Sequence, residues 1–456
     1  MALIDIKDMP RWSPLARVFG RARGWLCGEH SLTQRMAGAA FAIRAVSAGI
    51  IFLSQVLLAR WMGSGEFGTY VYVYTWLILV GELIHLGLPL TAQRFIPEYQ
   101  QERSSDLLRG YLSGSRWLTL AIGICAAALG ALIVYAAAPW LGNDIIVPLY
   151  FICLALPFYS FTYMLDGLAR SYNWINLALV PPFVLRPLLL ISVVAGMHLA
   201  GFGLEAATVA GVLAAVTCFT ALLQLYQFQR RINATVPAGP KRYDPRRWLS
   251  TSLPILLVWG MYTLLTSTDV LLLKQFRSPT EVAHYYAAAK TLALVSIIQF
   301  AVAAAAAHRF TAYHVAGDRT ALASLAADTV RWVFWPSLAA VFALMAVGHY
   351  LLMMFGASFT AGYPFMAVLA VGLLARASIG PTERLLNMLG EQKLCAVAYA
   401  AAFVVNVAVA LILAPAYGGI GVASATAAAF IVESVSLFLI ARRRLGLTMF
   451  VGRRPV

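Results

Sequence analysis

Twelve apolar runs, each about as long as a bilayer crossing requires, occupy most of this 456-residue chain. A helix crosses the hydrocarbon core with about 20 residues, and a backbone in lipid must satisfy its own hydrogen bonds. Strands of a membrane barrel would alternate in polarity over about ten residues, and these runs do not. The sequence therefore predicts an all-α polytopic membrane protein with helices at 39–59, 69–91, 117–138, 147–166, 175–198, 205–227, 250–273, 284–307, 331–354, 363–382, 394–414 and 420–441.

The composition and the placement of charge agree with this prediction. Only 12% of the residues are charged, against about 25% in soluble domains. The segments that precede or follow the crossings on one side hold 27 of the 34 Lys and Arg residues, and the opposite side holds only Arg60, Lys274 and Arg277. Because basic loops stay in the cytoplasm, we expect a multi-pass protein of the bacterial inner membrane with both termini cytoplasmic. The net charge of +15 is then explained without nucleic acid as a partner.

Segments at the two ends of the chain fall outside the crossings. Residues 1–38 place apolar and basic side chains at helical spacing, which favours an in-plane amphipathic helix on the cytoplasmic leaflet over a solvated tail. Residues 442–456 form a basic cytoplasmic tail. No secretory signal peptide is expected, because residues 1–38 lack a continuous apolar core.

The second half of the sequence repeats features of the first half. Glu66 and Tyr70 match Glu281 and Tyr285 at an offset of 215 residues, and Arg94 with Phe95 matches Arg309 with Phe310 at the same offset. The Gly-x-Gly at 201–203 matches the one at 419–421. We expect an N-lobe of six helices at 39–227, a cytoplasmic linker at 228–249 and a C-lobe of six helices at 250–441. Such pseudo-symmetric halves are typical of transporters, in which a site between them faces each side in turn.

Seven Asp, Glu, Lys or Arg residues fall inside the expected crossings, away from the end residues. A charge at mid-bilayer costs about 2.5–3.5 kcal/mol on insertion scales, so such residues face a cavity or a partner. Candidates for binding an anionic substrate in a cationic cavity are Arg186, Arg44, Lys290 and Arg376. Candidates for coupling or gating are Glu82, Asp269 and Glu433. Arg186 lies about 16 Å into its crossing, beside three prolines, and its planar guanidinium suits phosphate oxygens.

Each of these residues also has a purely structural interpretation. Asp269 and Lys290 could form a salt bridge across one hairpin, and Arg44 and Arg376 could reach the membrane surface with their long side chains. Arg186 could pair with Glu433 or Glu82. No catalytic constellation, nucleotide-binding loop or metal motif is found in the sequence, so we expect no enzyme and no cofactor beyond a coupling H⁺ or Na⁺.

The chain resembles the polysaccharide flippases of the Wzx type in the MOP superfamily. The resemblance rests on the segment 57–70, on Thr268 through Leu273 with Glu281 and Tyr285, and on later glycines and asparagines around 380–390 and 406–421. It covers roughly 37–441, with Ala283 in place of a usual glycine. It implies a V-shaped bundle of 12 helices that moves an undecaprenyl-diphosphate-linked oligosaccharide across the inner membrane for surface polysaccharide synthesis, coupled to an ion.

The resemblance also implies the partners. They are the lipid-linked oligosaccharide, membrane lipids and other membrane proteins of polysaccharide assembly. Two alternatives stay open: a multidrug or organic-cation antiporter of the same superfamily, whose cavity would be dominated by acidic residues, and an integral-membrane enzyme acting on lipid-linked glycans. The enzyme would need a catalytic acid in an outward loop, where only Glu66, Asp144 and Glu281 are found.

Overall fold

The computed structural model describes residues 29–452, apart from the side chains of 29–41 and of six residues between 304 and 315. The described chain is helical, with no strand within 29–452. Its α-helices are α2 (Glu29–Ile84), α3 (Leu88–Gln101), α4 (Ser105–Ala137), α5 (Asn143–Ser171), α6 (Ile175–Val180), α7 (Arg186–Leu199), α8 (Ala206–Thr235), α9 (Pro245–Phe276), α10 (Pro279–Ala293), α11 (Ser296–Val315), α12 (Arg319–Phe355), α13 (Tyr363–Ala377), α14 (Thr382–Met388) and α15 (Gln392–Ile440). Of the segment 1–38 that was expected to form an in-plane helix, residues 1–28 lie outside the described residues and 29–38 belong to α2.

Ten helical segments of the described chain are long and apolar enough to cross a membrane, and two of them cross twice. The 56 residues of α2 would span about 84 Å if straight, far more than a bilayer. The backbone instead reverses at Gly63, where φ is 79° and ψ is 166°. α15 likewise reverses at a glycine with positive φ, Gly418, where φ is 55° and ψ is −129°. With these two reversals the ten segments are compatible with the twelve crossings that the sequence predicts.

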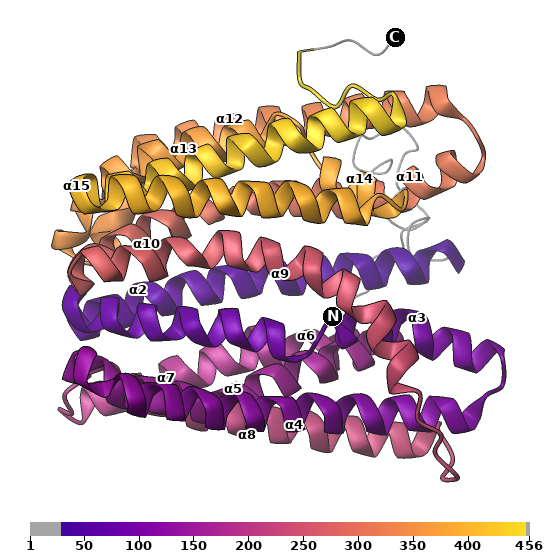
Figure 1. Cartoon of the computed structure of the whole chain (residues 1–456), viewed down its shortest axis with the longest axis horizontal. Coiled ribbons are helices and arrows are strands. Elements are labelled where there is room, and N and C mark those ends of the chain that lie inside the picture. Colours follow the sequence, from indigo (N-terminus) through magenta and orange to yellow (C-terminus); the bar gives the residue numbers. More distant parts are fainter. Residues whose placement is uncertain (1–28, 453–456) are drawn as a thin grey trace, which may run out of the picture.

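The helices form two groups that correspond to the two halves of the chain (Figure 1). In the first half α5 packs against α2, α4 and α8. In the second half α15 packs against α9 and α13. The chain ends that the structure describes lie at one end of the bundle, here called the termini side, and the opposite end is called the far side. The expected multi-pass fold is confirmed, whereas the residue boundaries of the lobes stay a prediction.

The repeated glutamates of the sequence perform the same structural role in each half. Glu66 accepts a hydrogen bond from the backbone N–H of Ala206 at 2.7 Å, where α8 begins. Glu281 accepts one from the N–H of Gly419 at 2.6 Å, where the second crossing of α15 begins. A carboxylate at a helix N-terminus satisfies an unpaired N–H and opposes the helix dipole. In each half, therefore, the repeated glutamate holds the N-terminus of the last helix through one hydrogen bond.

The two halves meet closely at the far side. The ring of Phe67 in α2 packs against Tyr286 of α10 and against Phe359, at centroid distances of 6.1 and 6.0 Å. A Cβ added to Gly68 would lie 1.8 Å from the carbonyl oxygen of Pro279, so only glycine permits this approach of α2 to α10. In Figure 1 these helices run side by side at the far side, while α11 and α14 diverge from α3 at the termini side.

At the termini side, the first turns of α9 are attached to the first half of the chain. Trp248 donates a hydrogen bond from Nε1 to the hydroxyl of Tyr99 at 3.0 Å, and Arg247 forms an ion pair with Glu98. Arg109 donates to the carbonyl oxygen of Pro240 in the connection before α9. Irregular backbone occupies only 236–244 of the expected 228–249 linker, because α8 runs on to Thr235 and α9 begins at Pro245.

Substitution of Gly68 by alanine is expected to open the far side. The added methyl group collides with the Pro279 carbonyl. If the two halves stayed together, this overpacked contact would cost about 1–3 kcal/mol, and separation of the halves relieves it. Double electron–electron resonance spectroscopy with spin labels at Ser64 and Ser278, in a cysteine-free background, should then report a longer distance between the labels than in the protein that keeps Gly68. Gly65→Ala is the matched control, because a Cβ at Gly65 has nothing within 4 Å. Equal distances in both variants would contradict this role of Gly68.

Candidate functional site

Several ionisable residues of the crossings lie where a helix is interrupted. Arg186 directly follows a π-helical turn at Pro181–Leu185. Glu82 lies in the last turn of the first long helix, before the break at 85–87. Lys290 and Arg376 occupy the last turns of α10 and α13. Broken helices are tolerated at membrane depth where the freed groups are buried in protein or line a cavity, and π-helical turns are frequent at functional sites.

Arg186 is a buried cation without a carboxylate partner among the described residues. Its side chain comes from α7, is 8% exposed, and places the guanidinium 4.8 Å from the centroid of Tyr159. Tyr74 and Tyr163 also interact with it, and its Nη1 has no hydrogen-bond partner in the described part of the chain. Neither expected counter-ion pairs with it, since the carboxylates of Glu82 and Glu433 contact other groups.

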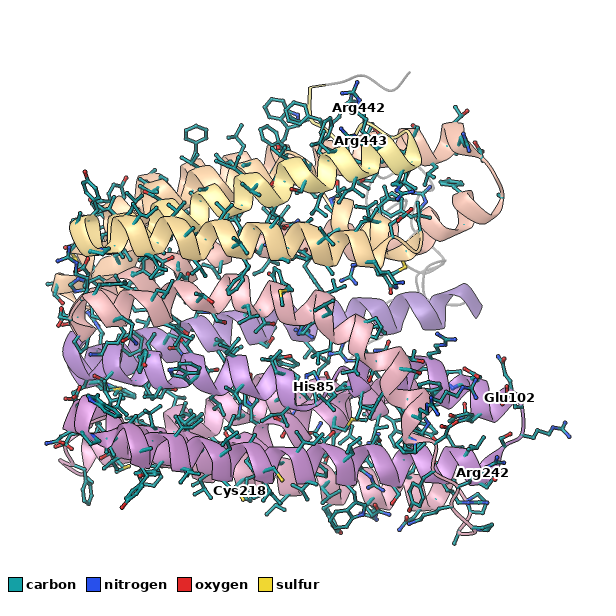
Figure 2. All side chains as sticks on the ribbon, in the orientation of Figure 1. His85, Glu102, Cys218, Arg242, Arg442 and Arg443 are labelled. Carbon is teal, nitrogen blue, oxygen red and sulfur yellow. The ribbon has the colours of Figure 1, made fainter. Side chains whose placement is uncertain are left out.

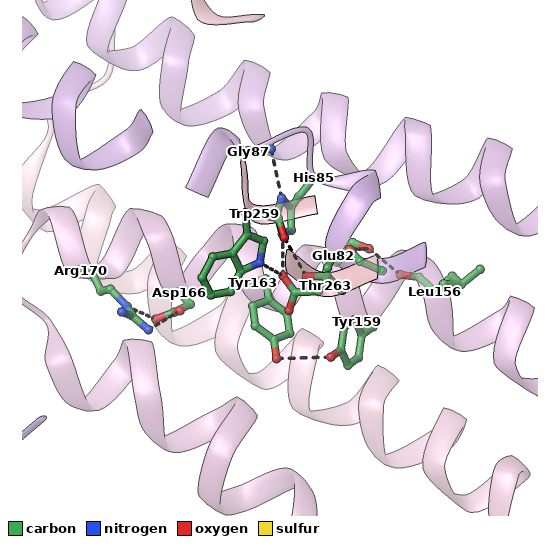
Figure 3. A network of polar contacts seen from close by, with 12 residues as sticks. Glu82, His85, Gly87, Leu156, Tyr159, Tyr163, Asp166, Arg170, Trp259 and Thr263 are labelled. Atoms are coloured by element: carbon green, nitrogen blue, oxygen red, sulfur yellow. Dashed lines mark hydrogen bonds and ion pairs between the residues drawn. The ribbon is translucent and has the colours of Figure 1, made fainter. Parts of the chain in front are cut away.

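Glu82 connects the two halves of the chain. Its Oε2 accepts a hydrogen bond from Nε1 of Trp259 in α9 at 3.0 Å and lies 3.3 Å from Nε2 of His85. Figure 3 shows these contacts beside the Tyr159–Tyr163 pair, and Figure 2 places His85 in the interior of the molecule. His85 Nδ1 in turn accepts from the N–H of Gly87 at 3.2 Å. The carboxylate is therefore held at the break between α2 and α3.

A second ion pair in this region was not anticipated from the sequence. Arg170 donates from Nε and Nη2 to the two carboxylate oxygens of Asp166, both at 2.7 Å, and Asp166 is 6% exposed. Asp166 is the last residue of its expected crossing, and Arg170 falls in the expected loop, because α5 continues to Ser171. Their spacing of four residues was the available signal, since such pairs share a helix face.

Arg44 lies beside this pair without forming an ion pair of its own in the described chain. Its guanidinium sits 4.2 Å from the ring of Phe183 and 6.0 Å from Phe300 in the other half. Aromatic faces stabilise a cation without neutralising it. Arg44 is therefore a half-buried positive charge between the halves, toward the termini side.

In the second half of the chain, Arg376 and Glu433 neutralise each other. Nε of Arg376 lies 3.1 Å from Oε1 of Glu433, whose side chain is 1% exposed. The guanidinium also faces the rings of Tyr262 and Phe430 at 5.1 and 5.5 Å. Arg376 thus differs from Arg44 and Arg186, because its charge is compensated within the protein.

Asp269 belongs to a cluster of oxygen atoms inside the second half. The hydroxyl of Tyr285 donates to Oδ2 of Asp269 at 2.8 Å and lies 3.3 Å from Oγ1 of Thr426. Asn406 donates to the same threonine oxygen at 3.4 Å, and its buried Oδ1 has no partner among the described residues. Oxygen-rich sites of this kind suit hard cations. The described chain has no cluster of three His, Cys, Asp or Glu residues for a transition metal.

Lys290 does not form the salt bridge with Asp269 that one interpretation of the sequence offered. No ion pair within 4.0 Å joins them in the described chain; Nζ of Lys290 instead lies 4.9 Å from the ring centroid of Tyr286. Lys290 and Asp269 therefore attract each other over a longer distance, without a direct ion pair.

The first half carries a neutral version of the Asp269 cluster. Gln55 and Asp269 each precede the sequence Val-Leu-Leu, and Tyr70 matches Tyr285. The Oε1 of Gln55 and the hydroxyl of Tyr70 are both buried without a hydrogen-bond partner in the described residues. The duplicated position thus holds a carboxylate in only one half.

Breaking the Arg376–Glu433 pair is expected to destabilise the protein by about 3–5 kcal/mol, because one charge stays buried without compensation. The midpoint of thermal unfolding in detergent should therefore fall strongly in Arg376→Met alone or in Glu433→Gln alone. The double variant should recover most of it, since no bare charge is left. Additive losses in the double variant would show that the pair is not coupled.

A model of the family described as polysaccharide biosynthesis protein matches residues 37–308, more than half of the chain. The chain belongs to this family. The resemblance found in the sequence is thereby confirmed. A search of curated proteins found no match to this chain.

Solved structures show the same fold. One is the inward-facing conformation of a multidrug-resistance MATE-family transporter of the MOP superfamily, with a TM-score of 0.74 and 16% identity over 88% of this chain and 94% of that one. The outward-facing conformation of such a transporter gives a TM-score of 0.65 and 17% identity over 89% and 95%. A third is a MOP-superfamily transporter from Pyrococcus furiosus, described by a reverse polarity of its binding pocket, with a TM-score of 0.65 and 15% identity over 89% and 95%. The chain therefore has the MOP transporter fold.

Proposed function

We propose that this protein flips a polyprenyl-diphosphate-linked oligosaccharide from the cytoplasmic to the outer leaflet of the bacterial inner membrane, for surface polysaccharide synthesis. The observation that carries the proposal is the buried guanidinium of Arg186, which lacks a carboxylate partner in the described chain and has an unpaired Nη1. A buried charge of this kind is costly unless an anion reaches it. The family, whose members act in polysaccharide biosynthesis by name, supports a glycan-linked anion.

The distribution of charge favours an anionic over a cationic substrate. Arg44, Arg186 and Lys290 have no ion pair within 4.0 Å in the described chain. Glu82, Asp166 and Glu433 lie beside His85, Arg170 and Arg376, and Asp269 alone among these carboxylates is held by neutral donors. A multidrug antiporter for organic cations would need uncompensated carboxylates toward its cavity. The diphosphate would lie between Arg186 and Lys290, because guanidinium and ammonium groups both bind phosphate oxygens.

The proposed cycle starts with the cytoplasm on the termini side. The close contact of Gly68 with Pro279 and the higher TM-score with an inward-facing relative support an inward-facing state. The diphosphate enters past Arg44 and replaces water around Arg186. Its binding lowers the repulsion between the unpaired cations, so occupancy favours closure of the termini side.

The cluster around Asp269 is the proposed site of coupling to H⁺ or Na⁺. The Asp269 carboxylate can change its charge, and the free Oδ1 of Asn406 would complete a set of oxygen ligands with Thr426. Tyr285 links this cluster to α10, which contacts α2 across the far side. A change of occupancy at Asp269 would therefore act on the helix that holds the far side closed.

Loss of the guanidinium at position 186 should abolish translocation. The assay uses proteoliposomes in which a fluorescent polyprenyl-diphosphate oligosaccharide becomes accessible to an external glycosidase. Arg186→Met should lower the initial rate by more than tenfold, because a charge-assisted hydrogen bond contributes about 1.5–3 kcal/mol, and Arg186→Lys should retain part of it. Arg116→Met is the matched control, a partly buried arginine that bonds Gln229. Full activity of Arg186→Met, or efflux of cationic dyes by the native protein instead, would refute the proposal.

Removal of the Asp269 charge should separate translocation from the ion gradient. In the same vesicles, the native rate should rise when a proton or sodium gradient is imposed, and Asp269→Asn should lose that response. Asp144→Asn provides the control, since Asp144 is an exposed carboxylate at the far side. An undiminished gradient response in Asp269→Asn would exclude this cluster as the coupling site.

A further inference from the structure

An apolar pocket of about 280 Å³ lies at the termini side of the second half, and neither Arg376 nor Glu433 is among its lining residues. Its walls are the last turns of α13 and of α15, and its rim is the chain that follows α15. The apolar lining residues include Ala375, Ile379, Ile431, Val435, Phe438 and Phe450.

The chain after α15 is fastened so that it forms this rim. Leu447 and Met449 are buried in the core at 8% and 0% exposure. The N–H of Val451 donates to the carbonyl oxygen of Ser378 at 3.1 Å. Phe450 is thereby held outside the core, 47% exposed, with its ring edge-on to Phe438 at 6.1 Å.

The lining of the pocket offers few hydrogen-bonding groups to water. Its two polar lining residues are Ser378 and Ser434, and both hydroxyls already donate within their own helix, to Ala375 and Phe430 at 2.6 and 2.7 Å. A buried water needs two to four polar partners, which this lining does not supply. An apolar occupant is therefore favoured.

Positive charge lies directly beyond the pocket. Arg442, Arg443 and Arg444 are exposed and form no ion pair within the described chain. They lie in a π-helical turn, Ala441–Leu445, so that Arg442 and Arg443 follow Phe438 by four and five residues and share its face of the helix. Figure 2 shows both arginines beside the chain that leaves α15.

We propose that this pocket binds one acyl chain of an anionic phospholipid from the leaflet on the termini side, with the lipid phosphate on Arg442 and Arg443. Charge complementarity selects the occupant, because a zwitterionic lipid would bring its own cation to the arginines. A basic residue near an anionic membrane surface strengthens binding roughly fivefold. The site is distinct from the proposed path of the substrate, which runs between the two halves.

The test titrates the full-length detergent-purified protein with dioleoyl phosphatidylglycerol or dioleoyl phosphatidylcholine, and measures bound lipid by native mass spectrometry together with the midpoint of thermal unfolding. The native protein should retain phosphatidylglycerol and gain stability from it, and phosphatidylcholine should bind more weakly. The double variant Arg442→Gln/Arg443→Gln should bind phosphatidylglycerol on the order of 10- to 30-fold more weakly. Arg230→Gln/Arg246→Gln removes two exposed arginines elsewhere and should leave binding unchanged.

A second pair of variants tests the pocket itself. Val435→Trp fills it from a position that is 52% exposed, so folding is not threatened, and it should abolish the phosphatidylglycerol-specific stabilisation. Val404→Trp, at a position 63% exposed in the preceding crossing, is the matched control and should retain it. Three outcomes would overturn the proposal: equal loss in both arginine variants, unchanged binding in Val435→Trp, or displacement of the lipid by farnesyl diphosphate at equal concentration, which would assign the site to the substrate.

Discussion

The requirement that each backbone polar group find a partner in hydrocarbon governs this structure. It forces every crossing into a helix, and it makes each helix interruption costly unless side chains or a second helix satisfy the freed groups. The interruptions are few, and charged residues lie at them. His85 accepts from the N–H of Gly87 where α2 gives way to α3, and Arg186 begins the helix after the π-helical turn. Irregular backbone and buried ionisable side chains therefore occur at the same places in the interior.

Most of the fold could be predicted from the sequence, because membrane crossings depend on the length and polarity of local segments. The twelve crossings and the repeat follow from such local patterns. The break after Ile84 was missed, because residues 85–91 are apolar enough to continue a crossing. Gly87, which adopts φ 73° at the turn, and Pro89 were the available signals of a break. The boundaries of the linker were missed for a related reason, because α8 remains helical through polar residues up to Thr235.

The candidate site could be predicted in its membership but not in its pairing. A charged residue within an apolar crossing is unusual, and this identified Arg186, Glu82 and Asp269, yet position along a crossing carries no information about rotation around the helix axis. Which carboxylate meets Arg376 depends on how α13 packs against α15, and only the structure shows that Glu433 does so. Asp166 was overlooked because it ends its apolar run, although its spacing from Arg170 fits an ion pair on one helix face.

The duplicated halves share a frame but differ in the chemistry of their interiors. Both keep a glutamate that accepts a hydrogen bond at the start of the final helix, and in each case the glutamate and the helix belong to the same half. Where the second half places Asp269, the first places Gln55, whose amide stays neutral at every pH. A change of charge at this duplicated position can therefore take place in the second half alone, so the two halves are chemically unequal at equivalent points of the frame.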